Sequence, residues 1–303
     1  MTGGSGFLGQ VFVKKLLALG HHVEAPLSSE CNLWAAESLD YYNDKPVDVI
    51  LHLAAWTQAG DFCLRHPGEQ WINNQLINTN VLNWWVKNHP SAKLVFMGTS
   101  CAYAESSELV EKNYMAGEPT QSLYTYAMTK RMLFQGARSL GEQFDLDWIG
   151  IVPSTLYGPN YHLDGRQMHF IFDLIKKILR GKFLGEPVVL WGDGYQRREL
   201  IHVSSFVDLS LDITQKCNRE LVNLGAGEDY SIRDFANKIC RIIGYDRNLI
   251  RYDTTKYVGA RSKVLDVNKA KTILDSYDKR LIDLDAGLQS TIQWFKDNKV
   301  YLN

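Results

Sequence analysis

The sequence predicts an α/β protein built on a doubly wound parallel sheet, followed by a smaller mixed α/β domain. Short apolar runs at 47–54, 93–97 and 148–152 have the length and hydrophobicity of strands that are buried on both faces. Stretches with a helical pattern of apolar residues lie between them, around 71–88 and 122–143. Such alternation of strands and helices is typical of a parallel sheet covered by helices on both faces.

A helix is also predicted over 10–19, where apolar residues recur at helical spacing and Gly20 follows as a stop signal. Beyond about residue 160 the pattern becomes mixed, and helices are expected near 168–180, 231–243 and 285–297. This change of pattern favours a second, smaller domain that packs closely against the first.

The composition is that of an ordinary globular protein. Of the 303 residues, 45% are apolar and 22% are charged, and the formal net charge is −1. A chain of roughly this length buries about 75% of its unfolded surface, so it needs no metal or disulfide to hold its core. Because the charges nearly cancel, neither nucleic acid nor an anionic membrane is expected as a partner.

The cysteines indicate a reducing compartment. They are odd in number, widely spaced and contain no CxxC pair, which argues against a disulfide framework and against a metal site; they are Cys31, Cys63, Cys101, Cys217 and Cys240. No apolar run approaches the ~18 residues of a membrane span, and the N-terminus lacks the pattern of a signal peptide. The sequence therefore predicts a cytoplasmic protein.

A glycine-rich segment opens the chain, with two residues between Gly3 and Gly6 and two between Gly6 and Gly9. Such a loop lets backbone N–H groups approach a pyrophosphate, which the N-terminus of the following helix also attracts. The motif normally follows a buried strand, yet only Met1 and Thr2 precede it. We therefore expect that the central first strand is missing from this sequence and that Met1 is internal to the natural chain.

Tyr126 and Lys130 lie four residues apart, on one face of a predicted helix. A tyrosine normally titrates near ~10, so a neighbouring cation is needed to make it a useful acid or base near neutral pH. Thr99 follows the strand 93–97, where its hydroxyl can hydrogen-bond a substrate oxygen beside the phenol. Together with the glycine motif, this combination predicts a cofactor-dependent oxidoreductase site.

These residues make the chain resemble the extended short-chain dehydrogenase/reductases, the NAD-dependent epimerase/dehydratase family. The segments 52–55 and 157–159 also match the family, and the resemblance covers essentially the whole chain. It implies a Rossmann-type sheet and a tyrosine that donates or accepts a proton while a nicotinamide moves hydride. It also implies that the lysine binds the ribose and lowers the pKa of the tyrosine.

The resemblance places the cofactor in the glycine loop, after the second strand and at the ends of later strands. The residues it assigns are Gly3, Ser5, Gly6, Phe7, Leu8, Gly9, Asn32, Leu33, Leu53, Ala54, Ala55, Lys130 and Pro153. The segments 4–5 and 27–29 carry no basic residue to hold the 2′-phosphate of NADP, and the second strand does not end in an acidic residue for the free ribose of NAD. The choice between NAD(H) and NADP(H) stays open.

Within the family, the chain is most similar to the GDP-L-fucose synthases, which epimerise and reduce a GDP-linked 4-keto-6-deoxy sugar. Segment 98–103 resembles their strand-end motif and places Cys101 at its cysteine, and His169 follows segment 152–159 at the same interval. The resemblance implies that these two residues are the acid/base pair that epimerises the carbons beside the keto group. The chemistry agrees, because inversion needs a base on one face and an acid on the other, and a thiol and an imidazole have suitable pKa values.

Segment 190–202 resembles the part of those enzymes that holds the nucleotide sugar. The register puts Arg198 and Lys263 at diphosphate-contacting positions and Trp191 near the nucleotide, and Lys177 is a further basic candidate. Guanidinium and ammonium groups are suitable partners for a diphosphate. Thr155 stands where the group has an asparagine, so the sugar itself is left open.

The resemblance divides the chain into a dinucleotide-binding domain over 1–160, to which 204–228 returns, and a mainly nucleotide-sugar-binding domain over 161–303. It implies a homodimer, for which the helices near 71–88 and 122–143 are candidates. Two other functions stay open: a related nucleotide-sugar enzyme, such as a C4 epimerase or a 4-reductase without epimerisation, and a non-catalytic NAD(P)-binding regulator. A 4,6-dehydratase is disfavoured, because segment 100–102 offers no carboxylate.

Overall fold

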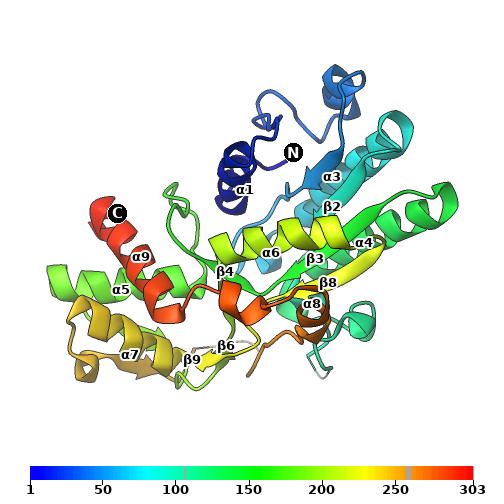
Figure 1. Ribbon diagram of the computed structural model, residues 1–303. Helices are drawn as coiled ribbons and strands as arrows, with labels where there is room; N and C mark the ends of the chain where they lie inside the picture. Colours follow the sequence, from blue (N-terminus) through cyan, green and yellow to red (C-terminus); the bar gives the residue numbers. More distant parts are fainter. Residues whose placement is uncertain (106, 257–260, 303) are drawn as a thin grey trace.

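The computed structural model describes residues 1–105, 107–256 and 261–302 (Figure 1). Its main sheet has four parallel strands in the order β1-β2-β3-β8. They span Val49–His52 (β1), Lys93–Met97 (β2), Trp148–Pro153 (β3) and Glu220–Leu224 (β8). The three strands predicted from apolar runs are confirmed, and β8 is a fourth that the apolar pattern did not identify. Beyond β1, Thr2 pairs in parallel with His52.

The two faces of this sheet bury alternate residues of the same strands. Ile50 and Leu94 pack with α3 (Pro67–Asn88) and α4 (Tyr124–Phe144), whereas Leu51 and Val95 pack with α1 (Phe7–Ala18) and α6 (Val203–Lys216). This burial on both faces explains why the strands appear in the sequence as continuous apolar runs. The prediction of a doubly wound α/β sheet is confirmed.

A second lobe lies at the other end of the molecule, where α5, α7 and α9 gather (Figure 1). These helices confirm the three predicted after residue 160 and span Phe170–Leu184 (α5), Ile232–Ile243 (α7) and Leu284–Asp297 (α9). Small two-stranded sheets complete the lobe and connect it to the first: β4 (Thr155–Tyr157) with β7 (Leu200–His202), β5 (Val189–Trp191) with β10 (Arg251–Asp253), and β6 (Arg197–Arg198) with β9 (Tyr230–Ser231).

The short elements complete the described chain. They are α2 (Phe62–Arg65), α8 (Asn268–Ile273) and seven 3-10 helices, η1 (Ala36–Tyr42), η2 (Ser100–Ala102), η3 (Glu111–Asn113), η4 (Gln121–Leu123), η5 (Arg247–Leu249), η6 (Tyr277–Arg280) and η7 (Val300–Leu302). Helix α8 packs on the core of the main sheet through Ala270, so the chain crosses back to the first lobe before α9. The division into domains at residue 160 stays a prediction.

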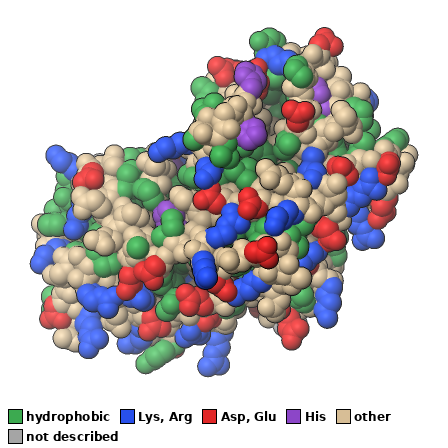
Figure 2. Space-filling view, in the orientation of Figure 1, with side chains coloured by type: hydrophobic (Ala, Val, Ile, Leu, Met, Phe, Trp, Pro, Cys, Tyr) green, Lys and Arg blue, Asp and Glu red, His purple; other side chains and the backbone are tan. Residues whose placement is uncertain are grey.

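The surface shown in Figure 2 has lysine and arginine side chains interspersed with aspartate and glutamate. Across the described ranges, no helix combines the length and apolar character needed to cross a bilayer. Nor do those residues place three or more histidine, cysteine, aspartate or glutamate side chains together as metal ligands.

Candidate active site

A cavity of about 810 Å³ lies between the two lobes. Cys101 enters it from η2, just beyond the carboxyl end of β2, and His169 enters it from the start of α5. The cavity is also lined by all four residues predicted to bind the substrate, Lys177, Trp191, Arg198 and Lys263. Its volume is in the range of small-molecule sites. The structure thus brings together six predicted residues that come from four separate segments of the chain.

Thr99 connects the predicted reductase residues with Cys101. It follows β2, and its Oγ1 accepts a hydrogen bond of 3.2 Å from the backbone N–H of Cys101 at the start of η2. Its own backbone N–H donates to the hydroxyl of Tyr114 over 3.3 Å. The hydroxyl of Thr99 also hydrogen-bonds Tyr126 of α4. One threonine therefore holds the phenol and the thiol at the same strand end.

The electrostatics of Tyr126 differ from the expectation. Burial raises the pKa of its phenol, the Cys101 thiol adds to the rise, and the hydrogen bond from Thr99 opposes it. Desolvation lowers the pKa of the buried Lys130 to about 8. The expected lowering of the tyrosine pKa by Lys130 is not found in the described residues, because burial dominates both groups. A raised pKa keeps the phenol protonated at neutral pH, which suits a proton donor.

Cys101 has an ammonium group beside its sulfur. The Nζ of Lys263 donates to its Sγ over 3.2 Å. Burial by itself opposes ionisation of this thiol, but the nearby Lys263, the hydrogen bond with Thr99 and the more distant Arg198 outweigh it, so the pKa of Cys101 is lowered from its ordinary value. A lowered pKa is what distinguishes a reactive cysteine from one that only fills space.

His169 precedes α5, and its backbone N–H donates to the hydroxyl of Tyr161 over 3.3 Å. The residue is exposed at the cavity wall, although many protein atoms surround it at longer range. That partial loss of bulk water, followed by the effect of nearby His162, lowers the pKa of its imidazole. An imidazole with a lowered pKa gives up its proton more readily once it is charged.

The predicted substrate residues line the same cavity as Cys101 and His169, and Lys263 reaches the sulfur of Cys101 directly. Lys177 forms an ion pair of 2.7 Å with Asp173, and its Nζ lies 5.9 Å from the centre of the exposed Trp191 ring. Arg198 donates from Nη1 to the carbonyl of Arg197 over 2.8 Å. The exposed indole and the cations offer a stacking surface next to positive charge.

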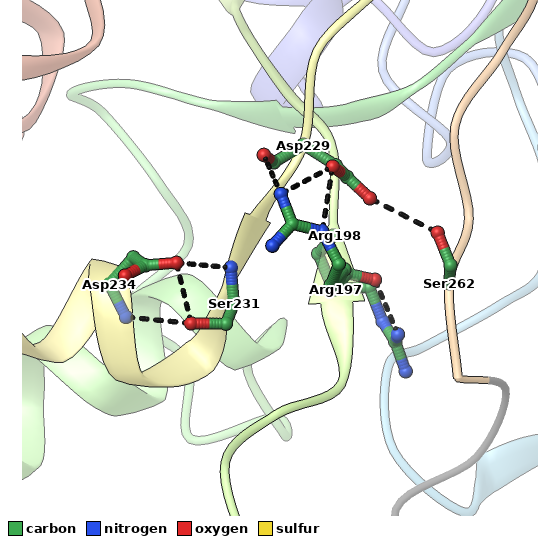
Figure 3. A network of polar contacts seen from close by, with 6 residues as sticks. All are labelled: Arg197, Arg198, Asp229, Ser231, Asp234 and Ser262. Atoms are coloured by element: carbon green, nitrogen blue, oxygen red, sulfur yellow. Dashed lines mark hydrogen bonds and ion pairs between the residues drawn. The ribbon is translucent and has the colours of Figure 1, made fainter.

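Arg198 belongs to a polar network around β6 (Figure 3). Its neighbour Arg197 donates to a carboxylate oxygen of Asp229 over 2.9 Å and also to the carbonyl of Asp229. The second carboxylate oxygen of Asp229 accepts a hydrogen bond of 3.0 Å from the hydroxyl of Ser262. The network therefore fixes the segment that precedes Lys263 relative to β6.

The glycine loop packs closely against neighbouring backbone just before the start of α1. Gly3 has a φ of +70°, a conformation that favours glycine, and a Cβ there would lie 2.8 Å from the backbone nitrogen of Ala54. Gly6 precedes α1 and provides no side-chain cap, and among the described residues no side chain is bonded to the first N–H groups of that helix, those of Phe7, Leu8 and Gly9. These features fit a dinucleotide pyrophosphate.

The other predicted cofactor residues lie in different parts of the first lobe, and each has its own contacts. The close approach of Gly3 places the loop against Leu53 and Ala54, and Ala55 follows them directly. Pro153 ends β3, and the carbonyl of the buried Leu33 accepts a hydrogen bond from Asn80. The side-chain oxygen of Asn32 accepts from the backbone of Trp34, and Ser5 accepts from Gln10 through its carbonyl. The ring of Phe7 instead packs edge-on against Tyr161 and Phe172 of the second lobe.

The sequence profile of the NAD dependent epimerase/dehydratase family matches residues 1–232 of this chain. The chain belongs to this family. The predicted membership of the extended short-chain dehydrogenase/reductases is confirmed.

Individual members of the family are similar to this chain over nearly their whole length. The GDP-L-fucose synthase of Escherichia coli (strain K12) is 28% identical, over 99% of this chain and 96% of that protein. A GDP-L-fucose synthetase structure from Naegleria fowleri has a TM-score of 0.86 at 21% identity, covering 98% of this chain and 93% of that one. A GDP-6-OMe-4-keto-L-xylo-heptose reductase structure from C. jejuni has a TM-score of 0.86 at 19% identity, covering 98% and 97%. These two structures confirm the fold.

The sequence did not identify Glu199, whose carboxylate holds backbone segments next to the cavity. Its carboxylate is buried and accepts the backbone N–H groups of Gly227 and Leu265 over 2.7 and 2.8 Å. Burial raises its pKa to about 7 despite these hydrogen bonds. Glu199 directly follows Arg198, but in a sequence a buried carboxylate cannot be told from a charged surface residue.

The close packing at Gly9 in the glycine loop can be tested by substitution. A Cβ on Gly9 would overlap the carbonyl oxygen of Gly3 and lie 2.7 Å from the Cα of Gly4, so backbone must move to accept it. We expect Gly9→Ala to lower the free energy of unfolding by about 1–3 kcal/mol and to weaken nicotinamide dinucleotide binding at least tenfold. Thermal unfolding and fluorescence titration with NADH and NADPH measure the two effects.

Gly68→Ala is the matched control, since nothing lies within 4 Å of its Cβ position in α3. It should leave dinucleotide binding unchanged and stabilise the protein by up to about 1 kcal/mol. If Gly9→Ala behaves like this control, the close packing of the loop against α1 does not shape a cofactor site.

Proposed function

We propose that the chain is an NAD(P)-dependent nucleotide-sugar epimerase/reductase acting on a GDP-linked 4-keto-6-deoxy hexose or a related 4-keto sugar. The observation that carries this proposal is the shared strand end at which Thr99 contacts both Tyr126 and Cys101, with His169 on the same cavity. A carbonyl placed there has a proton donor for its oxygen and two titratable groups for the neighbouring carbons. The proposal is also supported by relatives named as GDP-L-fucose synthases.

Reduction uses the phenol of Tyr126. Its raised pKa keeps it protonated, and it gives that proton to the carbonyl oxygen, which Thr99 also orients by hydrogen bonding. When bound, the nicotinamide supplies the hydride for the carbonyl carbon. Lys130, one helical turn away and buried, is proposed to bind the ribose of the dinucleotide.

Epimerisation uses Cys101 and His169. A hydrogen next to a carbonyl is acidic enough to be removed by a side-chain base, and return of a proton to the other face inverts the carbon. Two groups are needed because one side chain cannot reach both faces of a ring. The lowered pKa of Cys101 favours the thiolate, so the base is assigned to Cys101. His169 is then the acid on the other face, and its lowered pKa makes its charged form the stronger proton donor.

The substrate residues supply binding rather than chemistry. Arg198, Lys177 and Lys263 are proposed to neutralise the diphosphate, and Trp191 to stack with the base of the nucleotide. Thr155 also lines the cavity and is a candidate for the choice of sugar. A cytoplasmic homodimer, paired through α3 and α4, is part of the same proposal.

Product analysis tests this function. The protein is incubated with GDP-4-keto-6-deoxymannose or, separately, with a GDP-4-keto-heptose, each with NADH and with NADPH, and the products are identified by NMR. We expect one sugar to be reduced at its keto carbon and inverted at a flanking carbon. Reduction without inversion would identify a plain 4-reductase, and no turnover of either sugar with either nicotinamide would contradict the proposal.

A further inference from the structure

The contact between Lys263 and Cys101 is not explained by diphosphate binding. The two residues are 162 positions apart in the chain, and their side chains meet at 3.2 Å in the wall of the cavity. Both residues are only partly accessible to solvent. Attraction between opposite charges is stronger in such a site than in bulk water, so an ammonium at this distance strongly favours the thiolate.

The backbone on both sides of Lys263 is anchored. Two residues before it, the carbonyl of Arg261 accepts the backbone N–H of Arg197 over 2.8 Å. Immediately before it, Ser262 donates to Asp229 (Figure 3). Two residues after it, the N–H of Leu265 donates to buried Glu199. An ammonium on a long flexible side chain gains a defined position when the backbone that carries it is held at three points.

We propose that Lys263 is a positioning residue that holds Cys101 as the thiolate base of epimerisation, an inference that rests on the proposed function. The thiolate is also fixed from its backbone side, where the N–H of Cys101 donates to Thr99. Cys101 therefore lines the cavity with its backbone held by the Thr99 hydroxyl and its sulfur held by the Lys263 ammonium. The lowered pKa of this thiol has the direction that the contact requires.

The proposed epimerisation removes one proton from the carbon and returns one proton to it. The Cys101 thiolate takes the proton from the carbon next to the carbonyl, and the electron pair of the broken C–H bond forms an enolate whose oxygen is hydrogen-bonded by Tyr126. The imidazolium of His169 then gives a proton to the same carbon from the opposite face. The step leaves a thiol and a neutral imidazole, which return to their starting forms by exchange with solvent.

The test measures the thiol pKa in the protein without substrate. The rate of alkylation by iodoacetamide is followed against pH, and mass spectrometry of the Cys101 peptide separates this residue from the other cysteines. In the wild type the thiol should titrate below the ordinary value of about 8.5. Lys263→Met should raise this pKa by at least one unit, so that alkylation at pH 7 slows about tenfold. Lys263→Arg keeps the charge and should restore most of the rate.

Lys176→Met is the matched control, because Lys176 lines the same cavity from α5. It should leave the alkylation profile of Cys101 unchanged. In the presence of a 4-keto sugar in deuterated water, Lys263→Met should also move the acidic limb of the deuterium-exchange profile to higher pH, since the base then stays protonated longer. A change in KM alone would indicate diphosphate binding only and would contradict the inference.

The inference and the proposed function fail in different ways. A wild-type thiol that titrates at or above the ordinary value, or a Lys263→Met profile identical to that of the wild type, overturns the role of Lys263 even if the enzyme epimerises its sugar. Absence of epimerisation with a thiol pKa that depends on Lys263 contradicts the proposed function instead. The wild-type titration needs no variant, so it decides the matter even if Lys263→Met folds poorly.

Discussion

Replacement of Tyr126 by phenylalanine is expected to lower kcat for reduction of the 4-keto sugar by about 10²–10⁴-fold, the contribution typical of general acid catalysis. The change removes the hydroxyl that hydrogen-bonds Thr99 and is proposed to protonate the carbonyl oxygen, while it keeps the ring and its packing. Dinucleotide affinity should stay within about twofold of the wild type, because the phenol is not proposed to hold the cofactor. Steady-state kinetics and fluorescence titration measure these two quantities separately.

Lys130→Ala should give a different pattern from Tyr126→Phe. Lys130 is buried and is proposed to bind the ribose, so its loss should weaken dinucleotide binding as well as turnover. The comparison tests whether the two residues have separate tasks. Near-normal reduction by the Tyr126→Phe protein would remove the phenol from the mechanism.

Replacement of Cys101 by serine is expected to slow deuterium exchange at a carbon flanking the keto group by about 10²–10⁴-fold. A hydroxyl holds its proton much more tightly than a thiol at neutral pH, so neither the nearby Lys263 nor Thr99 can make the introduced serine an effective base. The exchange is measured by NMR in deuterated water without nicotinamide, because enolisation needs no hydride. His169→Ala should lose exchange at whichever carbon His169 serves.

The same two variants provide their own control. Cys101 and His169 are proposed to act at carbon atoms, whereas Tyr126 is proposed to act at the carbonyl oxygen. A ketone that already has the final stereochemistry should therefore be reduced by Cys101→Ser and His169→Ala protein at nearly the wild-type rate. Equal loss of exchange and of that reduction would mean that the substitutions damage the whole site.

Much of the fold could be predicted because the physical signals are local. Strands β1, β2 and β3 are continuous apolar runs, since helices cover both faces of the sheet. β8 was not predicted, because its first residue is exposed and its apolar run is interrupted by the polar Asn223. The side chain of Asn223 is buried and accepts a hydrogen bond from Tyr103. Nothing in a sequence shows that such an asparagine has a buried partner 120 residues away.

The sequence could predict which residues form the candidate site, but not how these residues shift one another's pKa values. Family resemblance placed Cys101 and His169 on one cavity, which the structure shows. It did not place Lys263 on the sulfur, because no spacing rule relates two such distant positions. It also implied a lowered pKa for Tyr126, where burial produces a rise. Long-range contacts and desolvation arise only when the chain folds, so local sequence patterns do not reveal them.

The most direct measurement of the central claim is deuterium incorporation by the wild-type protein. The 4-keto sugar is incubated with the enzyme in deuterated water, without nicotinamide, and the isotope is located by NMR. We expect deuterium at a carbon next to the keto group, because Cys101 and His169 are proposed to exchange protons there independently of reduction. If the protein reduces a 4-keto sugar well and yet incorporates no deuterium, it is a plain reductase, and Cys101 and His169 only shape the cavity.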